Sequence, residues 1–270
     1  MNEFLYDINS GLIAAFLLIS MVIAIEAGYR TGLGRSESTN EATRTHINGI
    51  LASILGILAL LLGFTFSLSL QRFDSRSEAV VNEANAIGTA YLRAQLIPEP
   101  LRRDARLALR DYIDLRVQAN TLTLVDRAER QALLAKAAGV QARLWDFART
   151  GVEADQYVYP PVLFVESVNQ LIDSFGTREA ALNRHVPELV LLLLYATFLM
   201  AGAILGFASG VAGHHPSLAS HIMVALIVVL VFIILDLDRP RRGLIQVSQA
   251  SLVDLQSSIH AEIGVDVRKP

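Results

Sequence analysis

The chain has 270 residues, of which 53% are hydrophobic and 18% charged, and its formal net charge at pH 7 is −3. This composition is too apolar for an ordinary soluble domain, so we expect lipid to supply part of its solvent. The absence of cysteine excludes a disulfide framework, a thiolate metal site and a thiol nucleophile.

Two pairs of apolar runs dominate the chain, at residues 8–29 and 47–70 and at residues 188–212 and 218–236. Each run approaches or exceeds the roughly 20 residues that an α-helix needs to cross about 30 Å of hydrocarbon. The layout predicts an all-α membrane protein with four transmembrane helices and a cytoplasmic helical domain inserted between the second and third. The expected domains are a first helix pair (1–70), the cytoplasmic domain (71–186), a second helix pair (187–238), and a C-terminal amphipathic helix with its tail (239–270).

The first run is expected to be a retained helix, because Glu3 and Asp7 precede it and no Lys or Arg supplies the basic start of a secretory signal. Glu26 lies near its end, where a carboxylate is costly in lipid. One interpretation is an interfacial ion pair with Arg30 at the favourable i, i+4 spacing. The other is a role in ion handling.

The second run contains two features. Small residues at near-helical spacing, typical of close helix packing, are Gly49, Ser53, Gly56, Gly63 and Ser67. Beside them, Ile57, Leu60 and Phe64 form a bulky apolar edge. This edge predicts a hydrophobic pore constriction if several copies surround an axis, and ordinary lipid-facing or core residues if they do not.

No helix breaker follows the second run until Pro98, so its helix is expected to continue beyond the membrane. An apolar stripe is expected on one face, at Phe73, Val80, Ala84, Ile87 and Tyr91. A polar line continues the apolar edge on another face, and we predict that it lines a pore or vestibule: Ser67, Gln71, Ser75, Glu78, Asn82, Asn85 and Thr89. Asn82 and Asn85 are poor helix formers, so a subunit interface or an ion-lining surface would explain them, with a solvated face as the alternative.

Further amphipathic helices are expected after the turn at Pro98-Glu99-Pro100. One runs to about Gln118, and the next runs from about Asp126 to Thr150, closed by Gly151 and with Trp145 and Phe147 in the core. Pro160 and Pro161 suit the first turn of a helix that carries through Gly176 into the membrane near Pro187. The expected apolar face of a final helix is Leu244, Leu252, Leu255, Ile259 and Ile263.

Arginine is distributed unevenly about the runs. Seven arginines flank the side that holds the termini and the central stretch, while the hairpin side has Arg30, Arg35 and Arg44. The positive-inside rule therefore favours cytoplasmic termini and a cytoplasmic central domain, in a bacterial inner membrane. The central stretch, residues 71–186, has 15 basic and 15 acidic residues, which argues against nucleic acid as a partner.

No pattern in the sequence supports an enzyme. His214, His215 and His221 invite a zinc interpretation, but the adjacent pair does not share a helix face and no carboxylate lies nearby. We therefore expect no metal, no cofactor and no catalytic residues, because nucleophile elbows, phosphate loops and HExxH are also absent. At the end of the fourth run, Asp236, Asp238 and Arg239 form either an interfacial salt-bridge cluster or an ion-binding rim.

Several sequence segments are informative when taken together: Glu26-Ala27-Gly28-Tyr29-Arg30, Leu62-Gly63-Phe64-Thr65-Phe66-Ser67, Val81-Asn82-Glu83-Ala84-Asn85, Thr89-Ala90-Tyr91-Leu92-Arg93, and Asp236-Leu237-Asp238-Arg239-Pro240 with Gly243-Leu244-Ile245. These segments resemble a bacterial and plant family described as a bestrophin-like domain of unknown function. A fainter resemblance extends to the bestrophins, which are pentameric anion channels whose second helix lines a narrow apolar neck. This resemblance implies that Ile57, Leu60 and Phe64 form such a neck.

The leading hypothesis is a homo-oligomeric, pentameric channel for small anions such as chloride, with the second span lining an axial pore. Its partners would be other copies of the chain, the bilayer and small inorganic anions. A stator-type energy-coupling subunit shares the layout but needs a single-span partner that carries a proton-binding acid. A non-conducting membrane sensor or scaffold would instead bind proteins through its central helices.

Overall fold

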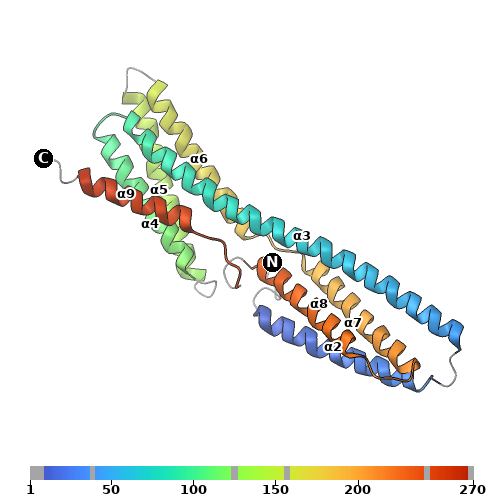
Figure 1. The fold of residues 1–270 in the computed structure, drawn as a ribbon. Helices are drawn as coiled ribbons and strands as arrows, with labels where there is room; N and C mark the ends of the chain where they lie inside the picture. Colours follow the sequence, from blue (N-terminus) through green and yellow to red (C-terminus); the bar gives the residue numbers. More distant parts are fainter. Residues whose placement is uncertain (1–8, 37–39, 123–126, 155–158, 240–243, 267–270) are drawn as a thin grey trace. The chain divides into compact units, whose positions relative to one another are not determined.

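A computed structural model describes residues 9–36, 40–122, 127–154, 159–239 and 244–266. Every regular element in that part of the chain is helical (Figure 1). The elements in order are α2 (Ser10–Leu33), α3 (Glu41–Arg93), the 3₁₀ turn η1 (Ala94–Leu96), α4 (Leu101–Thr121), α5 (Arg127–Ala154), α6 (Tyr159–Leu182), α7 (Glu188–Val211), α8 (Leu218–Leu237) and α9 (Ala250–Asp266).

The helices form two compact units. The span unit is Met1–Phe73 with His185–Ile245, and the second unit is Asp74–Arg184 with Gln246–Pro270. Helix α3 runs over 53 residues and contributes to both units. In chain order, α4, α5 and α6 stand between the second and third apolar helices.

Four helices of the span unit are long and apolar enough to cross a membrane: α2, the first part of α3, α7 and α8. They pack around one core, in which Met21, Leu58, Phe198 and Ile234 are buried. Polar side chains fix some of the helix ends. Asn9 accepts a hydrogen bond from the Gly11 N–H at 2.8 Å, and the Ser217 hydroxyl accepts one from the Ser220 N–H at 3.3 Å, which satisfies two of the backbone donors left open at the starts of α2 and α8.

Glycines allow α2 and α7 to approach until their backbones touch. A Cβ atom at Gly206 would lie 2.0 Å from the carbonyl oxygen of Ile25, and one at Gly28 would lie 2.0 Å from that of Ala203. No other residue fits at either position, which is how small residues allow close helix packing in membranes. The spacing of small residues predicted such packing on the second span. Among the described residues it is found between α2 and α7 instead.

The second unit buries its own core between the end of α3 and helices α4, α5, α6 and α9. Ile87, Leu109, Tyr112 and Phe164 are fully buried there. The expected apolar stripe on α3 is confirmed at Val80, Ala84, Ile87 and Tyr91, while Phe73 is partly exposed. Helix α9 lies along α4, where Gln256 donates to Asp114 at 2.7 Å and Arg106 pairs with Glu262 at 2.8 Å (Figure 1).

Several expected details of the later helices are wrong. Helix α5 runs through Gly151 to Ala154, because that glycine is buried where a Cβ would meet Ile97 at 3.0 Å and so serves packing rather than termination. Trp145 is exposed, since the buried face of α5 passes through Leu144 and Ala148. Phe147, also expected in the core, is half-buried.

The expected passage from one helix directly into the third span is also wrong. Helix α6 does begin with Pro160 and Pro161 in its first turn, but it ends at Leu182, and Pro187 stands at the N-cap of the separate helix α7. Proline fixes its own φ and disfavours helix in the residue before it, which accounts for the break. Leu244 was expected on the final helix, but it is exposed and precedes α9.

Candidate functional site

The predicted edge of α3 faces away from the core of its own protomer. Ile57, Leu60 and Phe64 are 55%, 58% and 62% exposed. The polar residues that continue this edge are also exposed, except for half-buried Thr89: Ser67, Gln71, Ser75, Glu78, Asn82 and Asn85. At about 100° per residue, all ten positions fall within roughly 80° of arc. We call this set the α3 line.

The buried side of α3 lies on the opposite part of the helix. Leu58, Leu62 and Thr65 are buried in the span unit, and Glu83 and Ile87 are buried in the second unit. Tertiary packing therefore fixes the rotation of α3 in both units. The α3 line is the face that this packing leaves open.

Small residues beside the α3 line have open space around them in the part of the chain that the structure describes. A Cβ at Gly49, Gly56 or Gly63 would meet no atom within 4 Å. Asn82 and Asn85 make no side-chain hydrogen bond with the described residues. The hydrogen-bond partners expected for these two amides are therefore not found among the described residues of the same chain.

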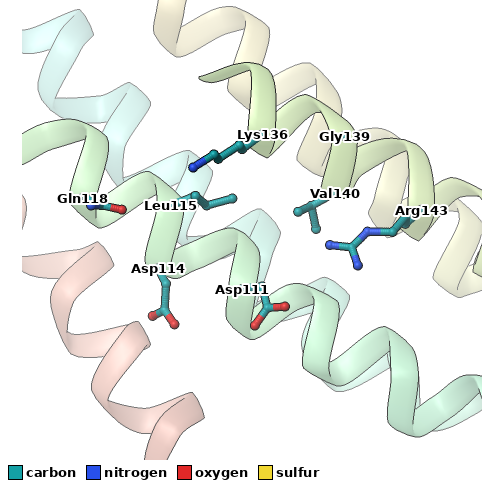
Figure 2. A pocket seen from close by; sticks show the side chains of 8 residues that line it. All are labelled: Asp111, Asp114, Leu115, Gln118, Lys136, Gly139, Val140 and Arg143. Carbon is teal, nitrogen blue, oxygen red and sulfur yellow. The ribbon is translucent and has the colours of Figure 1, made fainter. Parts of the chain in front are cut away.

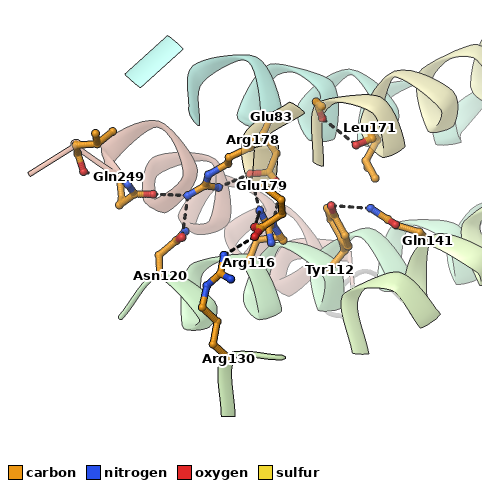
Figure 3. Close-up of polar contacts among 12 residues, drawn as sticks. Glu83, Tyr112, Arg116, Asn120, Arg130, Gln141, Leu171, Arg178, Glu179 and Gln249 are labelled. Atoms are coloured by element: carbon orange, nitrogen blue, oxygen red, sulfur yellow. Dashed lines mark hydrogen bonds and ion pairs between the residues drawn. The ribbon is translucent and has the colours of Figure 1, made fainter. Parts of the chain in front are cut away.

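A buried charge cluster lies behind the α3 line in the second unit (Figure 3). The Glu83 side chain is 0% exposed, and both of its oxygens accept from arginine. Arg116 donates to it from α4 at 2.5 and 3.3 Å, and Arg178 donates to it from α6. Arg116 also stacks on the Phe175 ring, 4.5 Å from its centroid.

Further contacts extend this cluster across the second unit. Glu179 accepts from Arg116 at 3.2 Å and from Arg130 of α5 at 2.5 Å. Arg178 donates to the side-chain oxygens of Asn120 at 2.8 Å and Gln249 at 2.6 Å. The cluster thus joins α3, α4, α5, α6 and the segment before α9 (Figure 3).

Burial and charge act against each other on these groups. Burial opposes ionisation of Glu179, but the donors Arg130 and Arg116 outweigh it and hold the pKa of that carboxyl below its ordinary value. Burial lowers the pKa of Arg178, and the nearby charge of Arg116 adds to this despite Glu83. Burial also disfavours the charged form of Arg116, yet Glu83 outweighs it and raises the pKa of that guanidinium. Burial and then Glu83 raise the pKa of Tyr112.

This cluster was not predicted from the sequence. The available indication was a charge on an apolar stripe, since Glu83 lies three residues after Val80 and four before Ile87. Both neighbours are core residues, so a carboxylate between them requires buried partners. Its arginine partners are 33 and 95 residues away, and no local pattern identifies them.

A second polar cluster closes the end of α8 in the span unit. Asp236 accepts from the Ile245 N–H at 2.8 Å and from the Ser10 hydroxyl at 3.5 Å. Asp238 accepts from the Val186 N–H at 2.8 Å, and Arg72 approaches it at 3.6 Å. Asp236, Asp238 and Arg239 are all buried, so they fit the interpretation as a structural cluster rather than an open rim.

Glu26 and Arg30 form the ion pair that their spacing suggested. The Arg30 Nε donates to the Glu26 carboxylate at 2.6 Å. Both side chains remain substantially exposed, in keeping with an interfacial pair. This contact satisfies the carboxylate within one helix.

Comparison with protein families identifies the chain. A family model for the bestrophin-like domain matches residues 14–252. The chain belongs to the bestrophin-like family. With four apolar helices and this membership, it is an integral membrane protein.

Solved structures share the bestrophin-like fold. One mutant of a bacterial bestrophin homolog from Klebsiella pneumoniae superposes with a TM-score of 0.66 at 16% identity, covering 92% of this chain and 98% of the other. A second mutant gives 0.65 at 16% identity, covering 94% and 99%. None of the curated proteins matches the chain.

Three of the sequence segments that carry the bestrophin-like resemblance lie at the packing sites described above. One contains Gly28, at the contact of α2 with α7, and another contains Glu83. A third contains the buried acids Asp236 and Asp238. In this chain, these three segments therefore contain a glycine needed for close helix packing and acids that are buried by tertiary contacts.

The histidines that invited a zinc interpretation have other contacts in the structure. Within the described residues, no group of three or more His, Asp or Glu could hold a metal ion. His215 packs instead against the Tyr29 ring, with centroids 4.1 Å apart.

A polar hollow of about 530 Å³ lies on the second unit between α4 and α5 (Figure 2). Asp111 and Asp114 lie on the α4 side, Lys136 and Arg143 lie on the α5 side, and Gly139 stands between the two cations (Figure 2). Asp114 is already bonded to Gln256 and His260 of α9. This hollow contains none of the site residues that the sequence analysis predicted.

Proposed function

We propose that this bestrophin-like protein is a homo-oligomeric channel for small anions such as chloride, with an axial pore lined by α3. The number of subunits is five, as the resemblance to bestrophins implies. The α3 line carries the proposal, because ten residues over about nine turns form one open edge that changes from bulky apolar to polar side chains.

The chemistry of the α3 line suits a pore in two parts. Ile57, Leu60 and Phe64 repeated around an axis form the constriction, where apolar walls gate ions by excluding water. Ser67 and the polar residues after it line a wet vestibule. Asn82 and Asn85 offer N–H donors that an anion accepts.

Flux through liposomes tests the constriction. Purified protein in chloride-loaded vesicles should conduct, and Phe64→Ala or Leu60→Ala should increase the rate several-fold because a smaller side chain lets the neck hydrate. Leu70→Ala is the matched control, since Leu70 is exposed on the same helix but lies about 100° from the centre of the α3 line. An absence of chloride flux in the wild type and all three variants would reject conduction and favour the stator or scaffold alternatives. An equal increase of the flux rate in all three variants would reject the proposed orientation of α3.

The cysteine-free sequence gives a direct test of the proposed orientation in a bacterial inner membrane, with the termini and the second unit cytoplasmic. Single cysteines at Ser217 and Gln95, both exposed, mark the two sides. An impermeant maleimide added outside spheroplasts should label Ser217→Cys at once and Gln95→Cys only after permeabilisation. The reverse pattern would invert the proposed topology.

A further inference from the structure

The span unit contains an apolar hollow of about 540 Å³ between α2, α7 and α8. Its size falls within the roughly 300–1,000 Å³ typical of ligand sites. None of the described residues that line it carries a charge. It lies apart from the α3 line, so its use does not depend on conduction.

The hollow has a buried floor and an open mouth. Leu17, Phe198 and Leu235 are buried at the floor, while Leu12 and Leu192 at the mouth are 65% and 60% exposed. These residues belong to membrane spans, so the mouth opens to hydrocarbon rather than to water. If the hollow were empty, the side-chain atoms at its floor would lack dispersion contacts on one side. An acyl chain of the surrounding bilayer is the nearest group that could restore them.

One polar group selects among acyl-bearing molecules. The hydroxyl of Tyr195 is the only polar side-chain atom among the described lining residues, and none of the described residues bonds to it. Its ring stacks on Phe16, with centroids 6.1 Å apart and planes within 11°, which fixes its direction. Tyr195 lies about 10 Å along α7 from Glu188, and helical side chains lean toward the helix N-terminus, so its hydroxyl is directed toward the end of the span at which α7 begins.

We propose that this hollow binds one acyl chain of a phospholipid, with the Tyr195 hydroxyl donating to an ester carbonyl oxygen. A neutral phenol is a suitable donor for a neutral ester. A phospholipid keeps its charged headgroup in the aqueous interface and presents a neutral ester beside Tyr195, whereas a free fatty acid would place its carboxylate there, where no described lining residue supplies a cation. The bilayer phospholipid is therefore the occupant.

Lipid retention tests the site with two neighbouring substitutions. Leu192→Trp fills the mouth, whereas Leu193→Trp places the same ring on an exposed position of α7 that does not line the hollow. Native mass spectrometry after mild detergent exchange should find phospholipid on the wild type and on Leu193→Trp, and about tenfold less on Leu192→Trp. Equal retention by both variants, or retention of fatty acid or detergent alone, would overturn the proposal.

A measurement on the unmodified sequence removes any dependence on the folding of variants. A phospholipid with a diazirine on its acyl chain, reconstituted with the wild type and illuminated, should attach to peptides from α2 and α7 that contain lining residues. Tyr195→Phe should retain lipid roughly two- to tenfold less well, as expected for one lost hydrogen bond. Attachment confined to peptides that contain no lining residue would contradict the site.

Discussion

Replacing Glu83 by Gln should strongly destabilise the second unit. The substitution preserves the shape of the side chain and removes the negative charge that Arg116 and Arg178 share. Both guanidiniums are almost fully buried, so neither gains water in exchange. Breaking a buried ion pair by removing one partner costs about 3–5 kcal/mol, chiefly because the remaining charge is left uncompensated.

This cost translates into a measurable change in melting temperature. For a unit of this size, somewhat below 150 residues, 1 kcal/mol shifts the midpoint by about 4 °C, so Glu83→Gln should melt about 12–20 °C lower. Trp145 is the only tryptophan in the sequence and lies on α5 of the second unit, so its fluorescence reports this transition directly.

Glu166→Gln is the matched control. Glu166 pairs with Arg93 at 3.2 Å but is 55% exposed, and surface pairs of this kind contribute about 0–1 kcal/mol. Its melting temperature should stay within a few degrees of the wild type. A decrease for Glu83→Gln no larger than that for Glu166→Gln would refute the assignment of a stabilising role to the buried carboxylate.

Three further outcomes are expected. Gly206→Ala should lower the free energy of unfolding in detergent by about 1–3 kcal/mol or more, because the added Cβ would lie 2.0 Å from the Ile25 carbonyl oxygen. Thermal unfolding measures this loss, and it should show none for the control Gly63→Ala, where the added Cβ has open space. Gly56→Leu should leave each subunit folded but reduce the oligomer mass in light scattering, since a side chain at Gly56 meets none of the described residues of its own chain within 4 Å. An unchanged mass would remove this position from the interface. The pKa of Glu179 is lowered in the folded state, so its stabilising contribution is present above the ordinary carboxyl pKa and is lost as pH falls through the folded value. The melting temperature should therefore drop in acid. Glu179→Gln should reduce this dependence of melting temperature on pH.

The four spans were predictable because lipid imposes a length requirement that is visible within each segment. Helices α7 and α8 end within about two residues of the expected limits. The continuation of α3 was also predictable, since no proline interrupts it before Pro98. Local composition was sufficient for these features because a transmembrane helix satisfies its backbone within one segment.

Features that depend on distant partners were not predictable. Gly28 repeats at four-residue spacing with Gly32, and Gly206 with Gly202 and Gly210, a pattern typical of close helix packing, but the partner of each set appears only when α2 meets α7. The glycines of α3 at positions 56 and 63 are also regularly spaced, yet a Cβ added at either would meet none of the described residues within 4 Å. The spacing of small residues indicates that one face of a helix allows close approach, whereas the three-dimensional fold determines which helix packs against that face.

The exposure of Ile57, Leu60 and Phe64 could be anticipated only as one of two alternatives. The same spacing fits a core face and an outward face, and the choice depends on where the buried residues of α3 lie. Leu58, Leu62 and Thr65 occupy the core side, which leaves the predicted edge open. Its use as a pore wall remains a prediction for the flux experiment.

The glycine contact between α2 and α7 has a consequence for biosynthesis. Between Leu33 and Glu188 the ribosome must add 154 residues, which takes roughly 10–30 s at about 5–20 residues per second. During that interval α2 resides in the membrane with its glycine groove unfilled, while α7 does not yet exist. A nascent chain in this state needs either lipid or an insertion chaperone to occupy the groove, and crowded synthesis would favour exchange of α7 between neighbouring copies.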